Sequence, residues 1–121
     1  MSNIVIKDTI EELIEVVQEK KAEDIRLFSV SEHNWMTEYV LVVGVKTPIH
    51  GKAVVEDVKK FFSRLPDQED VYTSPKISGQ PESGWTVVDA NSVVVHCINV
   101  EKRTYYDIDT LFEAQGDVYH Y

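Results

Sequence analysis

Residues 85–112 read WTVVDANSVVVHCINVEKRTYYDIDTLF and predict two strands, a tight polar turn between them and a short aromatic helix afterwards. The strands are expected over residues 86–89 and 92–100. The turn at 89–92 contains Asp and Asn, whose side chains can bond their own backbone. A single rigid hairpin would then present an aromatic ring, a carboxylate and an imidazole.

Two apolar runs indicate the middle of a sheet. Residues 93–95 are Val-Val-Val, and residues 39–45 are apolar throughout. Strands of this kind are usually buried on both faces, so cover is expected on each side of the sheet. A further strand is predicted over residues 25–30, before a polar break at 31–34.

Two amphipathic helices are predicted before the hairpin. Residues 8–11 have the form of a capping box and open a helix expected over 8–21. Thr47 and Pro48 suit an N-cap and a first helical position, so a second helix is expected from there to about residue 65. The expected core residues are Ile10, Leu13, Ile14 and Val17 in the first helix, and Val54, Val58, Phe61 and Leu65 in the second.

The remaining segments carry weaker signals. Residues 66–84 are rich in Pro, Gly, Ser and Asp and are interpreted as a connection holding at most one short strand near 76–78. A final helix of about eight residues is expected to begin near residue 106 and to end by residue 116, before a loose tail at 118–121. The chain is therefore predicted to be one α/β (α+β) domain, a mixed sheet of about five strands flanked by helices.

The composition limits the classes of partner that the chain is expected to bind. The chain has 121 residues, of which 43% are apolar, which is enough for one domain core and too little for two. The 12 Lys plus Arg against 21 Asp plus Glu give a net charge of -9. No window gathers the basic residues that a run of phosphates requires, so direct specific nucleic-acid binding is not expected. An acidic surface is steered toward a basic protein.

Several features predict a soluble cytoplasmic protein without metal or cofactor. The N-terminal residues lack the blocks of a signal peptide, and no apolar run is long enough to span a membrane. The four histidines, at positions 33, 50, 96 and 120, include no pair at the i, i+4 spacing that lets two imidazoles share a metal. His96 and the only cysteine, Cys97, should face opposite sides of a strand, so Cys97 is interpreted as a buried small residue. His96 is interpreted as a packed histidine in preference to a metal ligand.

Asp107 and Asp109 have the spacing of a two-carboxylate metal motif, as nucleotidyl transfer would require. That chemistry needs both acids on one face of a strand, whereas here they open a predicted helix. No phosphate-cradling glycine loop precedes them. The pattern therefore favours a helix cap over an enzyme, and a Mg-nucleotide enzyme is kept as the alternative.

The aromatic residues around the hairpin have two interpretations, core filling and partner binding. Trp85 follows the loop sequence Glu-Ser-Gly, and Asp89 lies at the predicted turn, where it could meet a partner's cation without prior desolvation. We expect Trp85 to be an interface anchor and Asp89 its charged neighbour. The full set of expected contact residues is Trp85, Val88, Asp89, Asn91, His96, Tyr105 and Tyr106.

Nearly the whole chain resembles the ribosomal silencing factor family, the Iojap-related group. Residues 20–25 (KKAEDI) are similar to its Lys-x-x-Asp-Ile motif before the first strand, and residues 36–44 to its Ala-Asp-Tyr-apolar strand. Residues 44–50 (GVKTPIH) resemble its Gly-x-Ser-x-x-His turn into a long helix. Residues 101–112 resemble the end of the family pattern. Tyr39 and His50 match that pattern, and either a binding role or a structural role fits them.

The resemblance also shows departures. This chain has Ser78-Gly79 where the family usually has Glu-Gly, Asn91-Ser92 in place of Gly-Asp, and Phe112 in place of tryptophan. Asp89, His96 and Tyr106 keep the pattern.

The resemblance implies a fold related to nucleotidyltransferases without their catalytic motif. It also implies binding to ribosomal protein L-fourteen of the large subunit, which would block joining of the small subunit and lower translation when nutrients are short. A generic interaction module, with the hairpin pairing with itself in a homodimer, remains a second alternative.

Overall fold

The computed structural model describes residues 3–30, 38–65, 72–114 and 116–121. The predicted polar break at 31–34 and the first residues of the motif at 36–44 lie outside them. In chain order the elements are α1 (Asn3–Glu19), β1 (Glu23–Ser29), β2 (Tyr39–Val45), α2 (Pro48–Arg64), β3 (Tyr72–Gln80), the short 3-10 helix η2 (Pro81–Ser83), β4 (Trp85–Asn91), β5 (Val93–Asn99), α3 (Val100–Tyr106), α4 (Ile108–Glu113) and β6 (Val118–His120).

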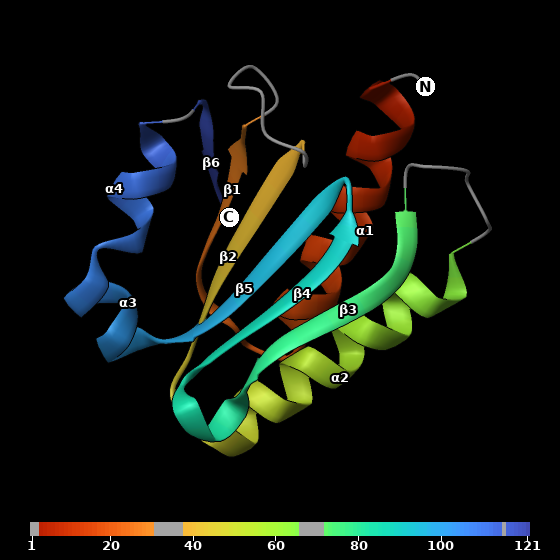
Figure 1. The fold of residues 1–121 in the computed structure, drawn as a ribbon. Coiled ribbons are helices and arrows are strands. Elements are labelled where there is room, and N and C mark those ends of the chain that lie inside the picture. Colours follow the sequence, from red (N-terminus) through yellow and green to blue (C-terminus); the bar gives the residue numbers. More distant parts are fainter. Residues whose placement is uncertain (1–2, 31–37, 66–71, 115) are drawn as a thin grey trace.

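The six strands form one mixed sheet in the order β3-β4-β5-β2-β1-β6. β2 and β5 pair in parallel at its centre, and the other neighbours pair antiparallel. Helices α1 and α2 lie on one side, and α3 and α4 lie on the other (Figure 1). The predicted α+β class is confirmed, with six strands where about five were expected, and β5 occupies the central position that its valines indicated.

The larger core lies between the sheet and helices α1 and α2. The four apolar side chains predicted to face inward from α1 are all buried. The helix begins at Asn3 and ends at Glu19, so its predicted bounds of 8–21 were shifted. Burying such a stripe is what holds an amphipathic helix of this length on a sheet.

Helix α2 begins where the sequence predicts. Thr47 is its N-cap, and Thr47 Oγ1 accepts a hydrogen bond from the His50 N–H at 3.0 Å. Val54 and Val58 are buried as expected, but Phe62 turns fully inward and Phe61 only partly. The inward stripe is thus rotated slightly from the predicted one.

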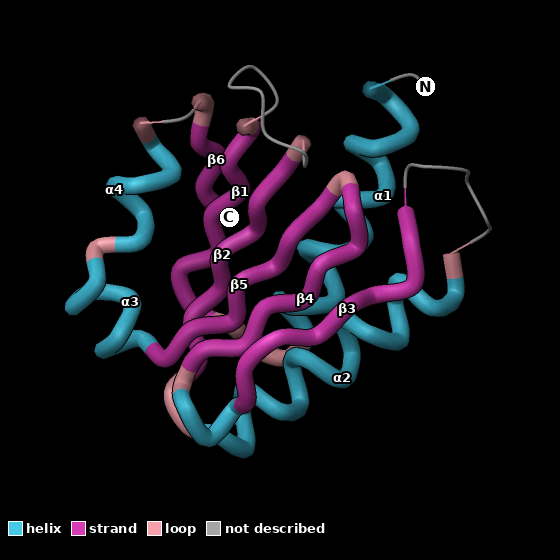
Figure 2. The backbone as a smooth tube through the Cα atoms, viewed as in Figure 1, coloured by secondary structure: helices cyan, strands magenta, loops and turns pink. Residues whose placement is uncertain are grey.

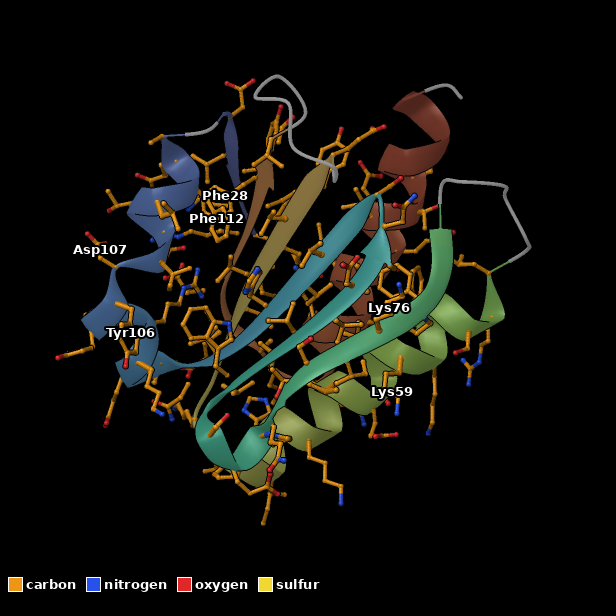
Figure 3. The ribbon with its side chains drawn as sticks, in the orientation of Figure 1. Phe28, Lys59, Lys76, Tyr106, Asp107 and Phe112 are labelled. Carbon is orange, nitrogen blue, oxygen red and sulfur yellow. The ribbon has the colours of Figure 1, made fainter. Side chains whose placement is uncertain are left out.

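A smaller core lies on the opposite side, beneath α4. Phe28 of β1 and Phe112 of α4 meet with ring centroids 5.5 Å apart (Figure 3). Ile108 packs beside them over Val40 and Val42 of β2. This apolar contact holds α4 against β1 and β2, so α4 does not cover β4 and β3.

Two segments are more regular than predicted, because the short strand expected near 76–78 is a nine-residue strand and the expected loose tail contains a strand. β3 runs from Tyr72 to Gln80 and pairs with β4, although its sequence of Pro75 and Gly79 is atypical of a strand. At the other edge, β6 pairs with β1 through Leu27 and Tyr119, so the predicted loose tail was wrong. Both are edge strands, where Pro and short length are tolerated because one side needs no partner.

The predicted single final helix is two short helices. Asn99 caps α3 by accepting hydrogen bonds from the N–H groups of Glu101 and Lys102, so helix starts six residues earlier than expected. Asp107 then adopts a left-handed conformation, with φ of 51°, and separates α3 from α4 (Figure 2). No helix in the described part of the chain is long and apolar enough to cross a membrane.

Candidate interaction surface

Alternate residues of β4 face opposite sides of the sheet. Thr86, Val88 and Ala90 are buried toward α1 and α2. Trp85, Val87 and Asp89 face the other side, where α3 and α4 cover the strands nearer β1 but leave β3 and β4 open (Figure 1). We call this uncovered area, with Trp85 at its border, the open face.

Trp85 and His96 are joined at the border of the open face. The indole Nε1–H of Trp85 donates a hydrogen bond to Nδ1 of His96 at 3.1 Å. Burial lowers the pKa of His96 from 6.5 to about 4, so the ring is neutral near pH 7. Because Nδ1 accepts the indole N–H, the remaining ring proton belongs on Nε2. His96 is therefore a packed histidine with a specific partner, as the interpretation of a non-ligand role predicted.

An aromatic cluster extends from this pair to the solvent. Trp85 and Tyr106 have ring centroids 6.0 Å apart, and Tyr106 meets Tyr105 edge-on at 4.9 Å. Tyr105 is 81% exposed and Tyr106 is 55% exposed, and both lie on α3. Figure 3 shows Tyr106 on this helix beside the sheet. We call Trp85, His96, Tyr105 and Tyr106 the aromatic cluster. Its buried half is ordered by the core while its outer half is available to a partner.

Asp89 lies at the far end of β4 from Trp85. The two residues are four positions apart on the same face, a separation of about 13 Å along a strand. The expectation that both sit together beside the hairpin turn is thus corrected. Asp89 is exposed, and its carboxylate accepts the backbone N–H of Asn91 at 2.9 Å, as expected for the turn. Asn91 has φ of 75°, a conformation that Asn tolerates well.

Val88 is a correction among the expected contact residues. Its side chain has no exposed surface and packs in the core with α2 on the side away from Trp85. Sequence reasoning placed it at the surface because the strand register was unknown. Val87, its neighbour, is the valine that faces the open side.

Tyr39 and His50, which were named because they match the family pattern, both make contacts within the fold. His50 Nε2 lies 2.7 Å from the carbonyl oxygen of Lys20, and its Nδ1 accepts the N–H of Lys46 at 3.4 Å. This imidazole therefore ties the end of α1 to the turn before α2. Tyr39 starts β2 and lies half-buried beside the larger core, on the side away from Trp85.

Sequence reasoning missed Lys76 of β3 and Val94 of β5, which flank Asp89 across the sheet. Lys76 was expected at the start of a short strand near 76–78, but nothing in the sequence indicated which strand would pair with it. Val94 was read only as part of an apolar run, yet it is half-buried and faces the open side. The open face thus carries apolar and basic side chains as well as acidic ones.

The groups that could support chemistry are engaged in structural contacts. Asp109 forms a bidentate pair with Arg103, from Nε to Oδ2 and from Nη2 to Oδ1, each at 2.8 Å. Asp107 Oδ1 accepts the hydroxyl of Thr110 at 2.8 Å. Cys97 is buried, and burial raises the pKa of its thiol to about 12. Among the described residues no group of three His, Cys, Asp or Glu side chains is placed to hold a metal ion.

The pairing of the hairpin bears on the homodimer alternative. β4 lies between β3 and β5, and β5 lies between β4 and β2, so both hairpin strands already have neighbours on each side. Self-pairing through the hairpin backbone is therefore incompatible with this sheet. That the protein forms a homodimer at all stays a prediction.

Comparison with known proteins places this chain in a family. A family model described as "Ribosomal silencing factor during starvation" matches residues 4–120. The chain belongs to this ribosomal silencing factor family. A family member from Treponema pallidum, named as a ribosomal silencing factor, is 29% identical over 82% of this chain and 85% of its own length.

Two further relatives extend the comparison. A mouse protein named "Mitochondrial assembly of ribosomal large subunit protein 1" is 27% identical over 91% of this chain, which spans only 47% of the mouse protein. A crystal structure of a Chromobacterium violaceum protein is 27% identical and superposes with a TM-score of 0.73, covering 89% of this chain and 86% of that one. The family fold seen there agrees with the mixed sheet described above.

Proposed function

We propose that this protein acts as a translational silencing factor that binds ribosomal protein L-fourteen on the large ribosomal subunit and blocks joining of the small subunit. Membership of the family supports a role at the ribosome. The name of the mouse relative supports the large subunit as the place of action.

The aromatic cluster carries the proposal. Large aromatic side chains that are rigid on one side and exposed on the other are the commonest anchors of protein interfaces. Trp85 is held by His96 and Tyr106, so little side-chain freedom remains to be lost when a partner covers the cluster.

The charge of the molecule suits a basic partner. The net charge is -9, and the exposed acids Glu101 and Asp107 lie on α3 and at its end, next to the tyrosines of the aromatic cluster, while Asp89 lies at the far end of β4. Opposite charges at the rim of an interface mainly accelerate association and orient the partners. A basic protein surface beside ribosomal RNA would meet these acids, whereas RNA itself would repel them.

The mechanism needs occupation of space only. An interface of standard size buries about 800 Å² on each partner, which a protein of this size can supply from the open face and α3. Once bound, the domain would occupy volume that the small subunit needs. The Asp107 and Asp109 carboxylates, which a nucleotidyltransferase would use for Mg²⁺, are instead held by Thr110 and Arg103.

Calorimetric titration of purified ribosomal protein L-fourteen into this protein tests the proposal. The wild type should bind, and Tyr105→Ala should weaken binding about tenfold because it truncates an exposed anchor. Ile77→Ala is the control, because Ile77 is an exposed apolar residue of β3 that lies beside α2, on the other side of the sheet from α3. Absence of binding, or equal losses in both variants, would contradict the proposal.

A further inference from the structure

A cavity of about 240 Å³ lies on the other side of the sheet from the open face, next to α1. The described residues that line it include three tyrosines and one carboxylate. Ile10 and Leu27, which are buried, supply apolar surface to the same cavity. The tyrosines and the acid are Tyr39, Tyr119, Tyr121 and Glu11.

The topology brings these side chains together from distant parts of the chain. Leu27 of β1 pairs with Leu41 of β2 on one side and with Tyr119 of β6 on the other. Tyr39 and Tyr121 each lie two residues from one of these partners, so all three tyrosines face α1 around Leu27. Tyr121 is fixed there by its N–H, which donates to the carbonyl oxygen of Ile25 at 2.9 Å.

The three tyrosine side chains that line the cavity are only partly buried. Tyr119 is 47% exposed and Tyr121 is 48% exposed, whereas Tyr39 is half-buried. A cavity bounded by tyrosines on this scale accepts one small group and not a drug-sized ligand, which needs about 300 Å³ or more. The site is therefore accessible from solvent and limited in size.

The electrostatics of the cavity favour a cation. Burial together with the charge of Glu38 raises the pKa of Tyr39, and burial together with Glu11 raises the pKa of Tyr121. The phenols of Tyr39 and Tyr121 thus remain neutral near pH 7, and each lies within the field of a carboxylate. No Lys or Arg is among the lining residues that the structure describes. Tyrosine ring faces attract cations, and phenol oxygens do so as well.

We propose that Tyr39, Tyr119 and Tyr121, with Glu11, form an aromatic cage that binds a methylated ammonium group. Such a cation carries its charge on an apolar, weakly hydrated body, which suits the rings and the surfaces of Ile10 and Leu27. A primary ammonium is strongly hydrated and would lose more solvent than one carboxylate replaces. This site is separate from the aromatic cluster and does not depend on the proposed ribosomal function.

The test is titration of the isotope-labelled full chain with choline, followed by amide chemical shifts. We expect saturable shifts confined to α1, β1, the start of β2 and the residues from β6 to Tyr121, while the neutral tert-butyl isostere of choline produces much weaker ones. Capped trimethyl-lysine is titrated in parallel. Tighter binding of trimethyl-lysine than of choline assigns the cage to a modified protein side chain, and the reverse order assigns it to a free small cation.

Paired variants isolate the residues of the cage. Glu11→Gln should weaken choline binding about fivefold, whereas Glu12→Gln removes the same charge from the adjacent position of α1, outside the cage, and should change it little. Tyr121→Leu should abolish binding while leaving the far-ultraviolet spectrum unchanged. The proposal is overturned by unsaturable shifts, by equal binding of the neutral isostere, or by equal effects of Glu11→Gln and Glu12→Gln.

Discussion

Trp85 donates its indole N–H to Nδ1 of His96, and these two side chains join the sheet to the exposed tyrosines of α3. The pairing register explains the contact. Val87 of β4 lies opposite His96 of β5, so Trp85 is the diagonal neighbour of His96 on the same face. Aromatic side chains at such diagonal positions are within reach of each other.

The first prediction concerns acid. Because the pKa of folded His96 is about 4 and its ordinary value is 6.5, the unfolded chain binds the proton first as pH falls. Above pH 6.5, His96 is neutral in both the folded and the unfolded chain, and it does not reduce the free energy of unfolding. As pH falls from 6.5 toward 4, proton uptake by the unfolded chain lowers this free energy, by about 3 kcal/mol at most. Urea unfolding at several pH values measures this loss. His96→Asn, which cannot titrate, should flatten the curve in this window, and an unchanged curve would show that another group is responsible.

A second prediction concerns the Arg103–Asp109 pair, in which Arg103 is 4% exposed. Burial of Asp109 acts to raise its pKa, but hydrogen bonds and charge from Arg103 outweigh it and hold the pKa below 3.8. Asp109→Asn would leave a buried guanidinium without its counter-charge and should cost about 2 kcal/mol or more of unfolding free energy. Its wild-type contribution is present above pH 3.8 and disappears as pH falls through the lowered pKa, below the His96 window.

Asp107→Asn is the control for this variant. Asp107 is exposed, and Asn also tolerates a positive φ, so the change should stay within about 0.5 kcal/mol. Chemical denaturation compares the two variants directly. Equal effects would mean that the Arg103 contact does not stabilise α4.

A third prediction separates binding from stability at Trp85. The indole is half-buried in the smaller core, so Trp85→Ala should reduce both the unfolding free energy and partner affinity. Trp85→Phe keeps a ring but leaves Nδ1 of His96 without its donor, which should cost about 1 kcal/mol of stability. Denaturation and titration are measured on the same samples. If Trp85→Ala weakens binding without changing stability, the ring is less packed than the structure indicates.

A fourth prediction concerns the charge of the open face. Asp89→Asn should slow association with a basic partner and reduce its dependence on salt, because Asn can still accept the turn hydrogen bond but carries no charge. Glu56→Gln on α2 makes the same change in net charge on the other side of the sheet. Stopped-flow rates at two salt concentrations compare them. Equal slowing would indicate that overall charge alone steers the encounter.

The local structure of the central elements could be predicted from sequence because the signals there are dense. β2 has the predicted bounds, 39–45, since every one of its residues is apolar or aromatic. Thr47 and Pro48 marked the start of α2 for the same kind of reason, a cap whose chemistry is local. The Asp89 to Asn91 turn also depends only on neighbouring atoms.

The rest depends on pairing between distant residues. β6 is only three residues long, and it is a strand because β1 lies beside it, more than eighty positions earlier in the chain. The break at Asp107 lies between α3 and α4, and Phe112 of α4 contacts Phe28 from the distant strand β1, which no local pattern indicates. In the candidate surface, the sequence supplied Trp85, His96 and the tyrosines, but only the register shows that Val88 faces the core.

A subunit-joining assay tests the central claim most directly. Purified large subunits, preincubated with a saturating excess of this protein, are mixed with small subunits, and light scattering follows the formation of complete ribosomes. We predict slow and incomplete joining, with the normal rate restored by the double variant Tyr105→Ala and Tyr106→Ala, because both side chains are largely exposed on α3. Joining at the normal rate in the presence of the wild-type protein would contradict the claim.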